Sequence, residues 1–165
     1  MTARRVVLID TNVILECHKR GFWRPLAGGY DLETVEKCIE ETQTGKQRRR
    51  PEHQIEEAEL RSSFSQIHTV SQREMAEVAV RGGNNLDAGE RELWAHAITR
   101  KDAWILCGPD KASVRFGYEA GFRERLISLE ELFADIGFRP PAPLKENFER
   151  EWLDGFVRKL ILGVF

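Results

Sequence analysis

The residues of this chain best suited to chemistry are four acids, Asp10, Glu40, Glu90 and Asp110. Asp10 ends the apolar run 6–9, and Asp110 follows the apolar run 104–107 after a Gly-Pro break. Short apolar runs of this kind are typical of buried parallel strands, whose carboxyl ends form the edge at which open α/β sheets bind ligands. A carboxylate at that edge is costly unless it is paired, protonated or bound to a metal. We therefore predict that these acids meet at one edge of a sheet and hold a divalent cation.

Clustered carboxylates of this kind suit phosphate chemistry. Mg²⁺ and Mn²⁺ prefer hard oxygen ligands, and a bound ion lowers the pKa of a water ligand and stabilises charge on phosphate oxygens. Asp87, three residues before Glu90, is a further candidate metal ligand, although this pair also matches a helix capping box. Glu41 is the alternative to Glu40 as the second acid, and the sequence leaves this choice open. Capping of the following helix is the alternative role for the two acids that end strands.

The elements that must position these acids alternate between strands and helices, a pattern that predicts a parallel α/β sheet. Strands are expected at residues 6–9, 67–70, 104–107 and 126–127. Residues 11–19 are expected to form a helix or a turn. Helices are expected at residues 32–44, 54–64, 72–80, 87–101, 111–120 and 129–136. Thr34 and Ser71 are the expected N-caps of two of these helices. Residues 22–29 are expected to form a loop because they include Pro25 and a Gly pair.

Length and composition limit the classes of protein to consider. The 165 residues suffice for one domain with its own core, and 41% hydrophobic and 32% charged residues are ordinary for a globular protein. No apolar stretch is long enough to span a bilayer, and no signal peptide precedes the first strand, so we expect a cytoplasmic protein. Three cysteines without metal spacing, Cys17, Cys38 and Cys107, are expected to be reduced core residues. The net charge of −2 argues against a general nucleic-acid coat protein, although residues 1–50 carry ten Lys and Arg against seven Asp and Glu.

The C-terminal segment is expected to extend the domain formed by residues 1–139. Pro140, Pro141 and Pro143 predict a stiff linker, and residues 145–162 are amphipathic. The apolar stripe consists of Phe148, Trp152, Leu153, Phe156, Val157, Leu160 and Ile161. We expect residues 140–165 to form a linker and a helix that packs on the domain, with a homodimer or another partner protein as the alternative surface.

The motifs around the acids resemble, in order and spacing, those of PIN-domain nucleases. They are LIDTNVIL at residues 8–15, TVEKCIE at 34–40, DAGEREL at 87–93 and LCGPDK at 106–111, and the resemblance covers residues 4–136. It implies a Rossmann-like three-layer α/β/α sandwich with a mostly parallel sheet. It also implies a Mg²⁺- or Mn²⁺-dependent endoribonuclease that acts on single-stranded RNA. Asp10, Glu40, Glu90 and Asp110 then take the acidic positions of the family, and Asn12 orients the first acid or a metal-bound water.

The resemblance also implies partners. Many bacterial PIN-domain proteins are toxins neutralised by a small antitoxin that fills the active-site groove, and others act in RNA processing. Pro109 stands where members of the family often have Thr or Ser. Residues 45–59 and the tail from residue 140 extend beyond a minimal toxin of this type.

Basic and aromatic residues are the expected contacts to RNA. We expect backbone phosphates to contact Lys46, Arg48, Arg49 and Arg50. Trp23 lies between Phe22 and Arg24 and is a candidate for stacking on an unpaired base, or alternatively an anchor in the core. The four histidines, His18, His53, His68 and His96, show no metal spacing, and no role is assigned to them.

Three other classes of protein are considered. A haloacid-dehalogenase phosphatase needs a second Asp two residues after its nucleophile, and this position is Asn12. A phospho-receiver domain usually has an acidic pair before its first-strand Asp and a late strand that ends in Lys, and neither arrangement is convincing here. The remaining alternative is a PIN-like fold that binds RNA or protein with little catalysis, against which the presence of all four acids argues.

Overall fold

The computed structural model describes residues 4–44 and 54–164. Its centre is a sheet of four strands in the order β3-β2-β1-β4, and every pairing between them is parallel. The strands are β1 Val6–Ile9, β2 Asp31–Val35, β3 Gln66–His68 and β4 Ile105–Cys107. The alternation of strands and helices in the sequence therefore predicts the class of sheet correctly.

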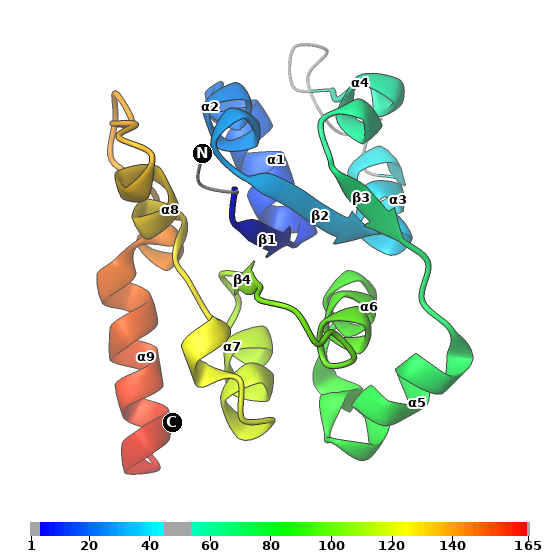
Figure 1. Ribbon diagram of the computed structural model, residues 1–165. Helices are drawn as coiled ribbons and strands as arrows, with labels where there is room; N and C mark the ends of the chain where they lie inside the picture. The colour runs from blue at the N-terminus through cyan, green and yellow to red at the C-terminus, as the bar shows by residue number, and fades with distance from the viewer. Residues whose placement is uncertain (1–3, 45–53, 165) are drawn as a thin grey trace.

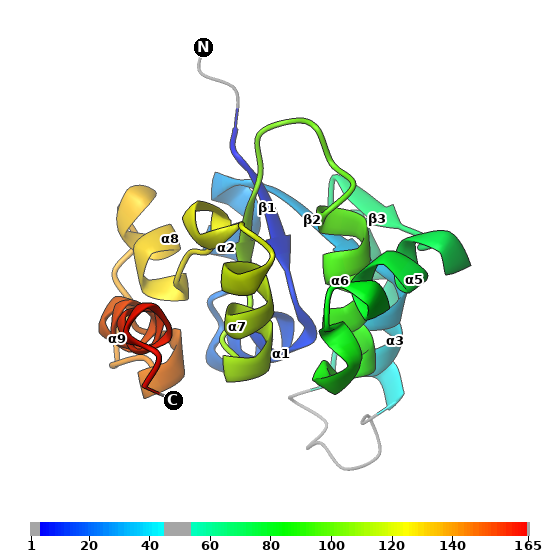
Figure 2. The same cartoon turned by 90° about the horizontal axis from the view of Figure 1, so that it is seen from below.

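Helices cover both faces of this sheet and complete a three-layer α/β/α sandwich. Above it in Figure 1 lie α1 Thr11–Arg20, α2 Trp23–Gly29, α3 Glu36–Thr44 and α4 Glu57–Ser62. Below it lie α5 Gln72–Val80, α6 Ala88–Ala97 and α7 Lys111–Glu119, and Figure 2 looks onto this second face. At one side of the sandwich stand α8 Leu129–Asp135 and α9 Arg150–Leu162. Within the described residues, no helix is both long and apolar enough to cross a membrane.

The central position of β1 follows from its apolar residues. Val7, Leu8 and Ile9 are fully buried, as expected for a parallel strand that helices cover on both faces. β1 pairs with β2 on one side and with β4 on the other, where Ile9 lies opposite Cys107. The two strands followed by Asp residues are thus neighbours, and their carboxyl ends meet at one edge of the sheet.

The prediction of a single helix at residues 32–44 is wrong for residues 32–35. These four residues belong to β2, and α3 begins only at Glu36. Leu32 and Val35 are buried in the sheet, and the Thr34 hydroxyl donates a hydrogen bond to the carbonyl of Ile9 (2.8 Å) rather than capping a helix. The apolar spacing of this segment fits a helix as well as a strand buried on both faces, and pairing with β1 decides between them.

Residues 22–29 form α2 where a loop is expected. Pro25 lies in the first turn of the helix, where a missing N–H breaks no helical hydrogen bond. Leu26 is fully buried, so tertiary packing stabilises this short helix. A Cβ on Gly29 would lie 2.6 Å from the Cγ2 atom of Ile136, which explains why a residue without a side chain stands there.

Other boundaries shift by a few residues. The helices expected at 54–64 and 87–101 shorten to α4 and α6, and the strand expected at 126–127 is reduced to an isolated bridge with β4. The helix expected at 72–80 matches α5, and Ser71 caps it in a capping box. The three cysteines are free and buried, as expected.

The amphipathic C-terminal helix packs on the same chain. Leu153 and Leu160 of α9 form an apolar cluster with Val114 of α7, and α9 also contacts α8. The last residue of the expected stripe, Ile161, is 47% exposed, and the neighbouring Leu162 is 68% exposed.

The segment before α9 contacts both α1 and the turn that follows β4. The Arg20 guanidinium donates to the Pro143 carbonyl (3.2 Å). Asn147 Nδ2 donates to the Pro109 carbonyl (3.1 Å), and the next N–H along the chain, that of Asp110, donates to the carbonyl at position 108 (2.9 Å). The peptide group that precedes Asp110 is thereby held at both its carbonyl and its N–H.

Candidate metal centre

A small cavity of about 230 Å³ opens at the carboxyl edge of the sheet. It lies where α1 begins after β1, where α6 begins, and beside α3. Its lining residues are Asp10, Thr11, Asn12, Glu41, Asp87 and Glu90. All are polar, and among the described residues no Lys or Arg lines this cavity.

Asp10 has one carboxylate oxygen bonded and one without a partner. The residue is 2% exposed and caps α1, because its Oδ1 accepts a hydrogen bond from the backbone N–H of Val13 (3.1 Å). Its Oδ2 is buried and has no hydrogen-bond partner. Burial raises the pKa of Asp10 to about 7, and the nearby charges of Asp87 and Asp110 add to this effect. Capping of α1 thus accounts for the position of Oδ1 but not for the burial of Oδ2.

Glu90 is a second buried acid that also takes part in a helix cap. Its Oε2 accepts the N–H of Asp87 (3.4 Å), and Asp87 Oδ1 accepts the N–H of Glu90 (3.0 Å), so the capping box suggested by the sequence is present. Glu90 is 4% exposed. Burial raises its pKa to about 8, with Asp110, Asp87 and Asp10 adding to the shift. Asp87 and Glu90 therefore both cap α6 and line the cavity.

Asp110 caps α7 and lies beside the cavity rather than in its lining. Its Oδ2 accepts the N–H groups of Ala112 (2.8 Å) and Ser113 (3.3 Å). The pairing of β1 with β4 brings it close enough for its charge to raise the pKa of both Asp10 and Glu90. Asp10, Glu90 and Asp110 therefore lie near one another at the carboxyl edge of the sheet.

The structure brings Glu41 rather than Glu40 to the cavity. Glu41 lines the cavity, and its Oε1 accepts a hydrogen bond from the Thr11 hydroxyl (2.7 Å). The Glu40 side chain is 58% exposed and pairs with Lys37 (3.3 Å), so it does not reach the site. Residues three apart share a helix face, and Glu41 follows the buried Cys38 by three positions whereas Glu40 follows it by two.

Gly89 leaves the space that the Glu41 carboxylate occupies. A Cβ at position 89 would collide with that carboxylate. The Ala-Gly-Glu sequence at the start of α6 was therefore a usable signal for a close approach of α3, although the sequence alone does not say which side chain approaches.

The residues expected to contact RNA are not brought to the cavity by the described structure. Lys46, Arg48, Arg49 and Arg50 lie outside the described residues. Trp23 is 8% exposed, donates from Nε1 to Ser63 Oγ (3.0 Å) and stacks on His18, with ring centroids 4.6 Å apart. It follows the end of α1, whereas Asp10 precedes the start of that helix, so it anchors the core and offers no free ring face near the acids.

The lining residues fit a hard divalent cation. The cavity offers carboxylate and amide oxygens, the ligands that Mg²⁺ and Mn²⁺ prefer. Without a cation, the clustered charges and burial hold protons on Asp10 and Glu90 near neutral pH. The unpaired Asp10 Oδ2 is the atom that most clearly lacks a partner there. Asn12 is exposed at the cavity rim and Asp87 at its mouth, so both can reach a cation or its water ligands.

Sequence reasoning missed a second cluster of potential ligands, Glu33, His68 and His96. These residues come from β2, β3 and α6 and lie far apart in the chain, so no spacing motif marks them. Glu33 lies on β2, whereas the sequence predicts a helix at residues 32–44, so the convergence of the three residues could not be recognised from the sequence.

Comparison with known proteins assigns no family to the chain. No protein-family model matches it, and no curated protein matches it. A functional conclusion therefore depends on the geometry of the acids.

Proposed function

We propose that this protein is a Mg²⁺- or Mn²⁺-dependent endoribonuclease of the PIN type that hydrolyses phosphodiester bonds of single-stranded RNA. The observation that carries the proposal is the buried Oδ2 of Asp10, which has no hydrogen-bond partner and belongs to a residue that lines an oxygen-rich cavity at the carboxyl edge of a parallel sheet. A buried carboxylate oxygen without a partner is costly, and a divalent cation would satisfy it.

Each acid has a definite part in this proposal. Asp10, Glu41 and Glu90 hold the cation from three elements, and Asp110 adds negative charge from the adjacent strand end. Asn12 orients the first acid or a water ligand. A bound Mg²⁺ or Mn²⁺ lowers the pKa of its water and stabilises charge on phosphate oxygens, so phosphodiester hydrolysis needs no covalent intermediate with the protein.

The partners follow from the same site. Lys46, Arg48, Arg49 and Arg50 follow Glu41 by five to nine positions in the sequence, and we propose that they bind RNA phosphates. A small antitoxin that covers the cavity is the protein partner expected for a toxin of this type. We place this activity in the cytoplasm, where RNA is available. The exposed apolar end of α9 would form the contact surface of a homodimer.

Cleavage of a labelled single-stranded RNA tests the proposal. We expect cutting with Mn²⁺ or Mg²⁺ but not with EDTA, and loss of cutting in Asp10→Asn and Asp110→Asn. Glu41→Gln and Glu40→Gln form a matched pair of neighbouring substitutions on one helix. The first should lose most activity because Glu41 lines the cavity, and the second should keep it because Glu40 faces solvent.

Two results would count against the nuclease. Cutting that persists in EDTA or in Glu41→Gln would exclude the carboxylate cavity as the active site. No cutting of any RNA, together with no Mn²⁺ binding in calorimetry, would favour a PIN-like module that binds RNA or protein without catalysis.

A further inference from the structure

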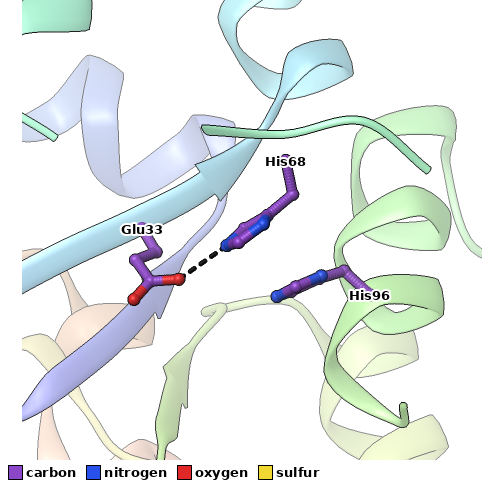
Figure 3. Close-up of side chains that lie close together, drawn as sticks. All are labelled: Glu33, His68 and His96. Atoms are coloured by element: carbon purple, nitrogen blue, oxygen red, sulfur yellow. Dashed lines mark hydrogen bonds and ion pairs between the residues drawn. The ribbon is translucent and has the colours of Figure 1, made fainter. Parts of the chain in front are cut away.

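The side chains of Glu33, His68 and His96 point toward one another (Figure 3). Glu33 lies in the middle of β2, His68 ends β3, and His96 lies in the last turn of α6. His68 Nε2 is 2.6 Å from Glu33 Oε1. The two imidazole rings stack with centroids 3.7 Å apart, and one potential ligand atom from each residue lies within 4.8 Å of the others.

This cluster is distinct from the carboxylate cavity. His96 follows Glu90 by six residues on α6, which places the two about 9 Å apart along the helix axis at 1.5 Å per residue. None of the three residues lines the cavity. The inference therefore stands independently of the nuclease proposal.

The charge balance of the cluster leaves room for a further cation. Arg100 Nη1 donates to Glu33 Oε1 (2.6 Å) and lies 3.1 Å from His96 Nε2. The same guanidinium makes two bonds to Asp102, from Nε (2.9 Å) and Nη2 (2.6 Å). One guanidinium thus serves two carboxylates, so the cluster holds one more carboxylate than guanidinium.

The Nε2 atom of His96 is placed as an acceptor within the cluster. It lies 3.1 Å from Arg100 Nη1, and because a guanidinium only donates hydrogen bonds, the lone pair of Nε2 points toward that nitrogen. The same lone pair is available to a metal ion that replaces Arg100 Nη1.

We propose that Glu33, His68 and His96 bind a transition-metal ion of the Zn²⁺ class. Two imidazole nitrogens and one carboxylate oxygen are a common ligand set for Zn²⁺, and imidazole selects such ions over Mg²⁺. The ion takes the position between Glu33 and His96 that Arg100 Nη1 now occupies, and the guanidinium stays paired with Asp102. Since the ligands come from β2, β3 and α6, the ion ties an edge strand to the sheet and to the helix that covers it.

Metal titration of the full chain, stripped of metal beforehand, tests this site. Zn²⁺ binding is measured by calorimetry, and Co²⁺ is used as a probe because its visible absorption reports nitrogen ligands. The wild type should bind Zn²⁺ at this cluster, and His96→Ala should bind it at least tenfold more weakly. Mn²⁺ binding at the carboxylate cavity should be unchanged in His96→Ala and lost in Asp10→Asn.

Arg100→Gln distinguishes a metal site from a cluster that is only structural, because the two interpretations predict opposite effects of this substitution on Zn²⁺ binding. Removing the competing guanidinium should tighten Zn²⁺ binding about tenfold or more, and Zn²⁺ should raise the melting temperature of this variant more than that of the wild type. Equal Zn²⁺ affinity in the wild type and His96→Ala, or weaker binding in a folded Arg100→Gln, would overturn the proposal.

Discussion

Substitution of Asp10 by Asn should stabilise the metal-free protein, and increasingly so as the pH rises. Asp10 is 2% exposed, and its pKa is raised from 3.8 to about 7. The folded state therefore binds a proton more tightly than the unfolded state does. In the wild type, the free energy of unfolding is not affected by this group below pH 3.8 and falls between the two pKa values. It is lowest above pH 7, where the loss reaches about 4 kcal/mol.

The pH dependence gives a cleaner prediction than the stability at one pH. An Asn side chain at position 10 keeps the oxygen that caps α1 but places an NH₂ group where Oδ2 has no partner, at a cost of about 1–3 kcal/mol. This cost does not depend on pH, so it cancels when two pH values are compared. From pH 5 to pH 8, the stability of Asp10→Asn relative to the wild type should rise by about 2.5 kcal/mol.

The assay is urea unfolding followed by tryptophan fluorescence in EDTA at both pH values. Asp135→Asn is the control, because this exposed aspartate forms a surface ion pair with the exposed Arg5 (3.1 Å) and does not line the cavity. Saturating Mn²⁺ should then stabilise the wild type by about 2.7 kcal/mol at one hundred times its Kd, and Asp10→Asn by much less. A relative stability that changes by less than about 0.5 kcal/mol between the two pH values would refute the proposed burial of an ionisable Asp10.

Two further substitutions test contacts around the same framework. Asn147→Ala removes the hydrogen bond to the Pro109 carbonyl and should weaken Mn²⁺ binding and RNA cleavage several-fold. It should lower the free energy of unfolding by only about 1 kcal/mol. Unchanged binding and cleavage would show that the tail does not position Asp110. Gly117→Ala places a Cβ 2.7 Å from two ring carbons of Trp94 and should destabilise the protein by about 1–3 kcal/mol in urea unfolding; wild-type stability would mean that the ring can move aside at little cost.

The acids that end strands could be located from the sequence because local patterns encode them. The apolar run before Asp10 and the one before Asp110 are too short and too hydrophobic for anything but buried strands, and parallel strands present their carboxyl ends together. The capping box of Asp87 and Glu90 is equally local, since both partners lie within one helical turn.

The choice between Glu40 and Glu41 could not be made locally. It depends on the residue at which α3 begins, and that depends on β2 pairing with β1 rather than on the propensity of residues 32–35. The Glu33 cluster was hidden for the same reason, because a residue expected on a helix was in fact on a strand opposite His96. The burial of Trp23 likewise reflects packing against Ser63 and His18.

The pairing of β1 with β4 also determines when the site can exist during synthesis. Asp110 follows Asp10 by one hundred positions, so the sheet edge stays incomplete until the chain around Asp110 has been made. Contacts between such distant segments form late because a long loop must first close. Asn147 joins the turn before Asp110 later still. A nascent chain that has not reached these residues thus carries separate acids but no cavity, and any activity of the carboxylate cluster begins only after β4 and Asp110 have joined the sheet.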